Sequence, residues 1–284
     1  MVNKVKRLAE VHKKAFRHEE TWAGDLPSIA ISVRDVSYSY TKKPFIESLD
    51  LDVERGKITS IVGPNGCGKS TLLKIIDGII EPQVGRVFID GKPSLEMGGK
   101  ERARHLALLT QGARPPAMSV EALVACGRYP YQNHMRSRPD AQDKLHIEEA
   151  MVLAGVERFR RHDVRYLSGG ERQRAFIAMT LAQDTGIIAL DEPTTYLDVR
   201  ACHEIMQLVC ELNENSRKTI VMVIHDLDLA LRYSKQMVVM ENGRCICTGT
   251  VEEVFVAGAI EQAFNIEVCR FPSDERVAYT LFPF

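Results

Sequence analysis

The hydrophobic residues in the first part of the chain follow the periodicity of β-strands. Around residues 29–33 and 49–53, apolar positions alternate with polar ones, a pattern typical of strands that bury one face. Residues 57–62, 86–90 and 105–110 are short and mostly apolar, and they predict further strands. This part of the chain is therefore predicted to be built mainly of strands.

Helical periodicity takes over in the second part of the chain. Residues 119–166 are predicted to be mostly helical, with turn signals at Pro130, Pro139 and Gly155. Helices and strands then alternate: helices are expected at 171–183, 199–212 and 227–233, and strands at 187–190, 219–224 and 236–240. Such alternation predicts an α/β fold whose parallel sheet is covered by helices on both faces.

Composition excludes several classes of protein. The chain has 284 residues, 45% hydrophobic and 26% charged, and a formal net charge of -1, which is ordinary for a soluble protein of one or two domains. This balance excludes a bulk polycation that coats nucleic acid, but not a local basic patch, and it argues against a disordered chain. No apolar run approaches the length of about 18 residues that predicts a membrane span. We therefore expect any membrane role to depend on a partner.

The N-terminal residues 1–27 are more charged than the rest of the chain. Val5, Leu8, Val11 and Ala15 fall at helical spacing, which predicts a short amphipathic helix. This segment is either an arm that binds a partner or a membrane surface, or a loosely docked extension. The second interpretation is favoured, because chain termini are often poorly ordered.

The chain has 7 cysteines at scattered positions, which predicts free thiols in a reducing compartment. Cys245 and Cys247 lie two residues apart in an expected strand, so they should share one face. As a metal pair they lack the further ligands of a structural zinc site. We therefore predict that they are small strand residues.

Residues 63–70 match the phosphate-loop pattern GxxxxGK[ST], with an expected strand before them and a helix after them. The glycines allow backbone N–H groups to turn toward phosphate oxygens, and the helix start adds a positive dipole end. Lys69 can reach the β- and γ-phosphates, and the Ser70 hydroxyl can ligate Mg²⁺. The predicted nucleotide-contacting residues are Gly63, Pro64, Asn65, Gly66, Cys67, Gly68, Lys69, Ser70 and Thr71.

An apolar strand at 187–190 ends in two carboxylates, Asp191 and Glu192. The carboxyl edge of such a sheet is where ligands bind. We predict that Asp191 holds the Mg²⁺ through water, and that Glu192 acts on the attacking water as general base or polariser. Alone, this pattern could be a strand that ends at the surface; the phosphate loop favours the catalytic interpretation.

Residues 167–171, Leu-Ser-Gly-Gly-Glu, precede a long expected helix. Ser168 is a natural N-cap, and Glu171 completes a capping box. The motif is therefore either only a good helix start or a second anion-binding helix terminus. It resembles the signature motif of the ABC-type ATPase family.

Further positions agree with that resemblance, which covers about residues 28–255. It implies that Gln111 is the Q-loop glutamine, which contacts Mg²⁺ and water, and that Asp198 belongs to the D-loop. His225 matches the switch histidine that touches the γ-phosphate. Tyr40 matches the aromatic residue that stacks on adenine, and Tyr38 is the rival, because both are expected on one strand face.

The resemblance also implies the architecture. We expect a P-loop NTPase (RecA-like) core with an antiparallel β subdomain and a helical signature subdomain at about 112–166, all within an ABC ATPase domain at 28–284. Residues 1–27 form an extension that departs from the family pattern. The family implies ATP and Mg²⁺ as cofactors and a head-to-tail dimer. Each ATP would lie between the phosphate loop of one chain and Ser168, Gly169 and Gly170 of the other.

Residues 127–131, Gly-Arg-Tyr-Pro-Tyr, together with 63–73, 167–175 and 191–198, look like the ATPases of iron-siderophore and cobalamin importers, with the ferric-citrate and ferric-hydroxamate branches the best match. This implies an ATPase at the cytoplasmic face of the inner membrane, peripheral to transmembrane permease subunits. It would act indirectly with a substrate-binding protein and not with nucleic acid. The alternative is a soluble ABC ATPase that serves as an assembly factor, for example in iron–sulfur biogenesis.

The resemblance also bears on the segment between Gln111 and Ser168. It is tethered at both ends to nucleotide contacts, so it is well placed to move with them. We expect a permease helix to dock between this segment and the Gln111 loop, with Arg128 as a surface residue that can test the contact. The alternative is that the segment only caps the core.

Overall fold

The computed structural model of the chain describes residues 27–112, 114–132, 139–272 and 277–283. The amphipathic helix expected near the N-terminus lies outside these residues.

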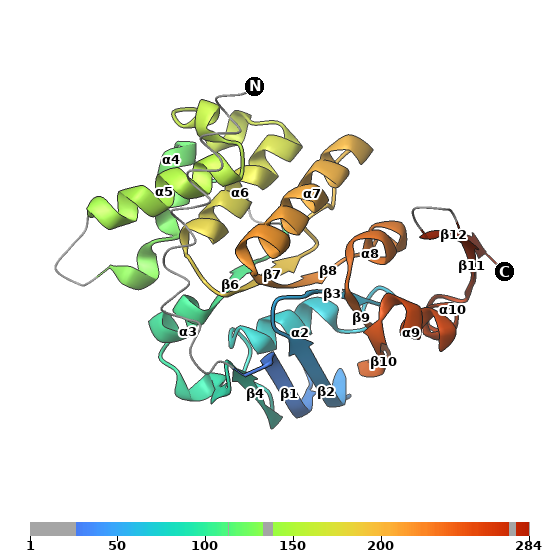
Figure 1. The fold of residues 1–284 in the computed structure, drawn as a ribbon. Coiled ribbons are helices and arrows are strands. Elements are labelled where there is room, and N and C mark those ends of the chain that lie inside the picture. The colour runs from blue at the N-terminus through green and yellow to red at the C-terminus, as the bar shows by residue number, and fades with distance from the viewer. Residues whose placement is uncertain (1–26, 113, 133–138, 273–276, 284) are drawn as a thin grey trace.

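A mostly parallel sheet forms the centre of the fold (Figure 1). In spatial order its strands are β10 (Arg244–Thr250), β9 (Gln236–Glu241), β3 (Ile58–Val62), β8 (Thr219–Val223), β7 (Ile187–Asp191) and β6 (Leu106–Leu109). Only the β10–β9 pair in this sheet is antiparallel. Strands β3, β7 and β8 are buried along their whole length, as expected for apolar strands covered on both faces.

An antiparallel sheet lies against one face of the core. Its strands, in spatial order, are β2 (Ile46–Glu54), β1 (Ile29–Tyr38), β4 (Val84–Ile89) and β5 (Lys92–Pro93). Helix α2 (Lys69–Ile76) is packed between the two sheets (Figure 1). Ile31 of β1, Leu72 of α2 and Val221 of β8 belong to one buried cluster, so this packing fixes α2 relative to both sheets.

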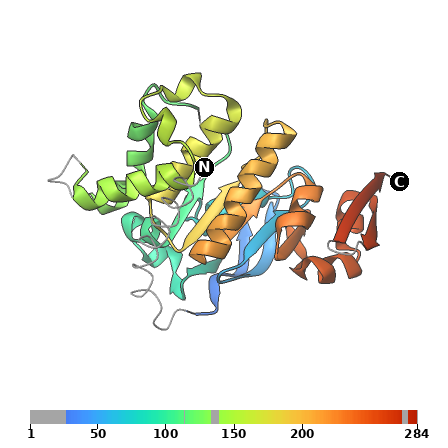
Figure 2. The same ribbon diagram turned by 45° about the horizontal axis from the view of Figure 1, so that its top comes forward.

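Helices cover the other face of the central sheet (Figure 2). Helices α6 (Gly169–Ala182), α7 (Val199–Ser216) and α8 (Leu227–Tyr233) lie on this face, and α4 (Val120–Cys126) and α5 (Ala141–Leu153) pack on α6. Short connecting helices are η2 (Ser94–Glu96), α3 (Gly99–His105), η3 (Tyr129–Tyr131), η4 (Glu157–Phe159) and η5 (Val164–Tyr166). A second buried cluster runs from α4 and α5 through α6 to the sheet, so the helical segment and the core share one hydrophobic interior.

The C-terminal part packs beside α8. It consists of α9 (Val251–Val256), α10 (Ala259–Phe264) and a hairpin of β11 (Ile266–Pro272) and β12 (Val277–Pro283). Within the described part of the chain, no helix is both long enough and apolar enough to cross a bilayer.

The expected α/β fold class is confirmed, and some local elements differ from the prediction. Helix α3 precedes β6 at a place where the sequence pattern predicts no helix. The prediction that Cys245 and Cys247 share a face is wrong, because a register shift between them interrupts the pairing of β10 with β9. Cys245 packs against the buried cluster that contains α2, and Cys247 packs against the buried cluster that runs from α4 and α5 through α6 to the sheet. Among the described residues, no group of three or more His, Cys, Asp or Glu side chains could hold a metal ion.

A buried hydroxyl in the central sheet leads to a stability prediction. Thr59 in β3 is fully buried, and its Oγ1 has no hydrogen-bond partner among the described residues. Because an uncompensated buried hydroxyl costs about 1–3 kcal/mol, Thr59→Val should raise the free energy of unfolding by about that amount, measured by urea denaturation. Thr219→Val is the matched control: Thr219 is equally buried, but its Oγ1 accepts a bond from the Gly56 N–H (2.9 Å), so its loss should destabilise. Destabilisation by both changes would contradict the prediction.

Candidate nucleotide-binding site

Strand register brings four separate chain segments to one edge of the sheet. Ile61 of β3 and Asp191 of β7 both pair with Val223 of β8, and Leu109 of β6 pairs with Leu190. Because these strands are parallel and their registers are aligned, the residues that follow them lie close together at the carboxyl edge of the sheet. These residues are the loop at 63–68, Gln111, Glu192 and His225.

The loop after β3 is shaped by close backbone packing. Gly63 has φ +154°, and a Cβ there would lie 2.1 Å from the Met240 carbonyl oxygen, so only glycine fits. Gly68 is the N-cap of α2 and provides no side-chain cap, which leaves the first N–H groups of the helix available to an anion. The Lys69 ammonium is held inside the loop, where it donates to the carbonyl oxygens of Gly63 (2.7 Å) and Pro64 (2.9 Å).

The expected loop residues divide into two groups. Asn65, Gly66, Gly68, Lys69, Ser70 and Thr71 line a cleft together with Phe45, Glu192 and His225. The Cys67 side chain instead belongs to the buried cluster between the sheets, and burial raises the pKa of its thiol. Only the backbone of Cys67 can therefore face a nucleotide.

Ser70 and Asp191 form an oxygen-rich pair beside the loop. The Ser70 hydroxyl donates to Asp191 Oδ1 at 2.8 Å. Burial raises the pKa of Asp191, the hydrogen bond from Ser70 opposes this, and the charge of Glu192 adds to the increase. Hydroxyl and carboxylate oxygens next to a phosphate loop are the ligands that Mg²⁺ prefers, and a cation would offset the repulsion between the two carboxylates. The residues therefore fit the expected ion.

Glu192 is held in an unusual backbone conformation. Its φ is +54°, and its N–H donates to the Val223 carbonyl of β8 (3.1 Å). Its carboxylate, with only 7% of the side chain exposed, accepts hydrogen bonds from Gln111 Nε2 and from Thr195 Oγ1 (2.9 Å) and pairs with His225 Nε2. The carboxylate is thus fixed by partners from the segments that follow β6 and β8 and from its own loop.

The tyrosines expected to stack on adenine occupy different environments. Strand β1 ends at Tyr38, so the prediction that Tyr38 and Tyr40 share a strand face is wrong. Tyr40 is 56% exposed, and its hydroxyl shares a hydrogen bond with Thr71 Oγ1 (3.0 Å), whereas Tyr38 packs against the core. Their rings are 4.9 Å apart, and Tyr40 also contacts Phe45 at 5.3 Å.

Sequence reasoning missed Phe45 and Thr195 as site residues. Phe45 follows a turn and precedes a strand, a position that gives no chemical signal by itself. Thr195 lies three residues after Glu192, a spacing that allows a turn to bring the hydroxyl back to the carboxylate, and this was the available signal.

The signature residues face a second cleft. Ser168 caps α6, with a reciprocal bond from its N–H to Glu171 Oε2 (3.1 Å), and Asp198 caps α7 by accepting from the Ala201 N–H (2.8 Å). Ser168, Gly169, Gly170 and Asp198 line this cleft, which does not include the phosphate loop. Within one chain the structure therefore does not bring these residues to Glu192.

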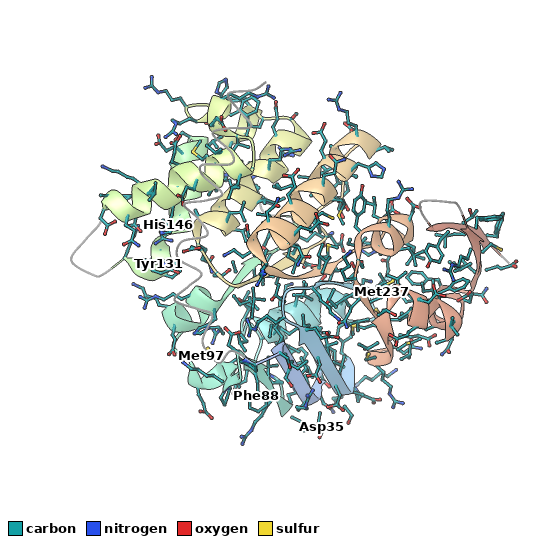
Figure 3. All side chains as sticks on the ribbon, in the orientation of Figure 1. Asp35, Phe88, Met97, Tyr131, His146 and Met237 are labelled. Carbon is teal, nitrogen blue, oxygen red and sulfur yellow. The ribbon has the colours of Figure 1, made fainter. Side chains whose placement is uncertain are left out.

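The expectation that Arg128 is a surface residue is wrong. Arg128 is 3% exposed and stacks on Tyr131, labelled in Figure 3, at 3.9 Å from the ring centroid. It donates to Asp143 Oδ1 of α5 (2.8 Å) and to the Ala182 carbonyl at the end of α6 (2.9 Å). Arg128 therefore joins α4, α5 and α6 from inside.

A phosphate loop between β3 and α2, facing carboxylates at the ends of neighbouring strands, defines a P-loop nucleoside triphosphatase. A family model described as ABC transporter matches residues 46–195, more than half of the chain, and the chain belongs to that family. It is an ATP-binding ATPase of the ABC type.

Individual relatives cover most of this chain. It is 41% identical over 246 residues to the petrobactin import ATP-binding protein FpuD of Bacillus anthracis. The match covers 86% of this chain and 89% of that protein. It is 42% identical to YusV of Bacillus subtilis, a probable siderophore transport system ATP-binding protein, with the same coverage. The dimeric structure of MJ0796, a bacterial ABC transporter cassette, matches with a TM-score of 0.68 and 29% identity over 78% of this chain and 98% of that one.

Proposed function

We propose that this chain is the ATP-hydrolysing subunit of an ABC importer that powers uptake of an iron-siderophore or a related metal chelate. The observation that supports this proposal most strongly is the identity of 41–42% to a petrobactin import ATP-binding protein and to a probable siderophore transport ATP-binding protein, along most of both chains. A cleft that the phosphate loop lines together with Glu192 and His225 supports the proposal.

Different residues of the site bind the nucleotide, hold the metal ion and act on the attacking water. The N–H groups of the loop and α2, with Lys69, bind the phosphates; Tyr40 stacks on adenine, and Tyr38 is the alternative. Ser70, Asp191 and Gln111 would hold Mg²⁺, which would supply charge neutralisation at the phosphates. Glu192 takes a proton from the attacking water, and His225 contacts the γ-phosphate.

We further propose that ATP is shared by two copies of the chain. Because Ser168, Gly169, Gly170 and Asp198 face a cleft other than that of the phosphate loop, they are free to meet the nucleotide of a second copy. The dimeric structure of the MJ0796 cassette supports the pairing of two copies. One ABC ATPase domain would span 28–284, with its helical subdomain at about 112–166 and residues 1–27 as an extension.

The remaining partners are transmembrane permease subunits and, indirectly, a substrate-binding protein; nucleic acid is not expected. The chain would lie at the cytoplasmic face of the inner membrane, with a permease helix docked between the helical segment and the Gln111 loop. Tyr129 suits this surface, since it is 63% exposed and lies beneath the Lys100 ammonium (5.0 Å).

The test is purification of the tagged chain from detergent extracts, followed by uptake of iron chelates. We expect a multispanning membrane protein to co-purify, and Tyr129→Glu to impair uptake while the basal ATPase activity of the isolated chain stays unchanged. A complex made only of soluble proteins would instead support the assembly-factor alternative. Intact uptake in Tyr129→Glu would exclude the docking surface.

Lys69→Ala should weaken ATP binding about 10–150-fold, because it removes charge-assisted hydrogen bonds to phosphate worth about 1.5–3 kcal/mol. Calorimetric titration with ATP measures this loss. Lys144→Ala, on the exposed face of α5, is the control and should bind ATP normally. An affinity of Lys69→Ala within about twofold of the unmodified chain would refute the phosphate-loop assignment.

A further inference from the structure

The Glu192 carboxylate receives hydrogen bonds from two kinds of donor. Gln111 follows β6 and His225 follows β8, so both belong to segments distant from Glu192 in sequence. Thr195 belongs to the same turn as Glu192: its N–H is bonded to the Glu192 carbonyl (3.4 Å), and its Oγ1 donates to Glu192 Oε2 (2.9 Å). The turn thus carries a carboxylate and a donor for that carboxylate as one unit.

The donors differ in whether they can keep their hydrogen bond to the Glu192 carboxylate during ATP hydrolysis. In the proposed function, Gln111 would contact Mg²⁺ and His225 would contact the γ-phosphate, so both would have to release Glu192 at least in part. Thr195 has no such second task, and the short turn keeps its hydroxyl beside Oε2. It therefore remains able to hold one carboxylate oxygen while the other faces water.

We propose that Thr195 is a positioning residue for ATP hydrolysis: its hydroxyl holds Glu192 Oε2 and leaves Oε1 to accept the proton of the attacking water. This inference rests on the proposed role of Glu192 and extends it to a residue that does not touch the nucleotide. The geometry agrees with it, because Oε2 is the atom shared with Gln111, whereas Oε1 is the atom that faces His225 at the cleft.

The test compares Thr195→Val, which keeps the shape and removes the hydroxyl, with Thr195→Ser, which keeps the hydroxyl. In steady-state ATPase assays, we expect Thr195→Val to lower kcat about tenfold or more, with KM and the ATP affinity within about twofold of the unmodified chain. Thr195→Ser should restore most of kcat. The control is Thr194→Val, since the Thr194 hydroxyl does not bond to Glu192 in the described structure, and its kcat should be unchanged.

A second measurement asks whether Thr195 acts through Glu192. In single-turnover assays of Glu192→Gln, adding Thr195→Val should leave the slow residual rate unchanged, because the carboxylate is already gone. Three results would each overturn the proposal. They are an equal loss of kcat in Thr195→Val and Thr195→Ser, a change in KM alone, and losses of rate in Thr195→Val and Glu192→Gln that add up in the double variant. If the unmodified chain binds ATP without hydrolysing it, the proposed function fails as well. If the unmodified chain hydrolyses ATP and Thr195→Val has the same kcat, only the role of Thr195 is refuted.

Discussion

Glu192→Gln is expected to lower the rate of ATP hydrolysis about 10²–10⁴-fold while ATP binding persists. The amide keeps the size of the side chain but cannot accept the proton of the attacking water. The phosphate contacts come from the loop, α2 and Lys69, which the substitution does not touch. Phosphate release measures the rate, and calorimetry measures the affinity.

The same variant should accumulate as a dimer that holds two ATP molecules, detectable by size-exclusion chromatography with and without nucleotide. The control is Glu252→Gln, which changes a carboxylate on α9 that pairs with Arg270 at the surface, and which should turn over normally. Near-normal hydrolysis by Glu192→Gln would mean that another group performs the proton transfer.

Arg128→Ala should destabilise the chain by about 3–5 kcal/mol, the usual cost of breaking a buried ion pair by removing one partner. The change leaves the buried Asp143 carboxylate without its cation and the Ala182 carbonyl without its donor. It also removes the guanidinium that stacks on Tyr131. Urea unfolding of the isolated chain measures the loss.

A surface arginine provides the comparison for this prediction. Arg232 pairs with Asp228 on α8 at 3.6 Å, and both side chains are about half exposed. Because exposed pairs contribute about 0–1 kcal/mol, Arg232→Ala should be close to neutral. If Arg128→Ala were equally mild, the buried pair would not hold α4, α5 and α6 together.

The Gly-Arg-Tyr-Pro-Tyr segment at 127–131 shows how motif and environment differ. The sequence marks it as a feature of iron-chelate importer ATPases, and Arg128 is expected from it to be a surface residue. The structure instead buries Arg128 and exposes Tyr129. An arginine with two acceptors and an aromatic partner can be buried. Those partners come from α5, α6 and η3, and the sequence does not show that these elements meet at Arg128.

By itself, the sequence determined the features that depend on neighbours along the chain. Periodicity defined the buried strands, the glycine spacing defined the phosphate loop before α2, and the spacing of Ser168 and Glu171 defined the cap of α6, because these depend on hydrogen bonds and sterics within a few residues. Only the tertiary structure decided which distant groups meet. The register of β6, β7 and β8 gave Glu192 its partners Gln111 and His225, and the register shift in β10 separated Cys245 from Cys247. The pairing of strands and the packing of helices are set by contacts between segments far apart in sequence, so no local pattern contains them.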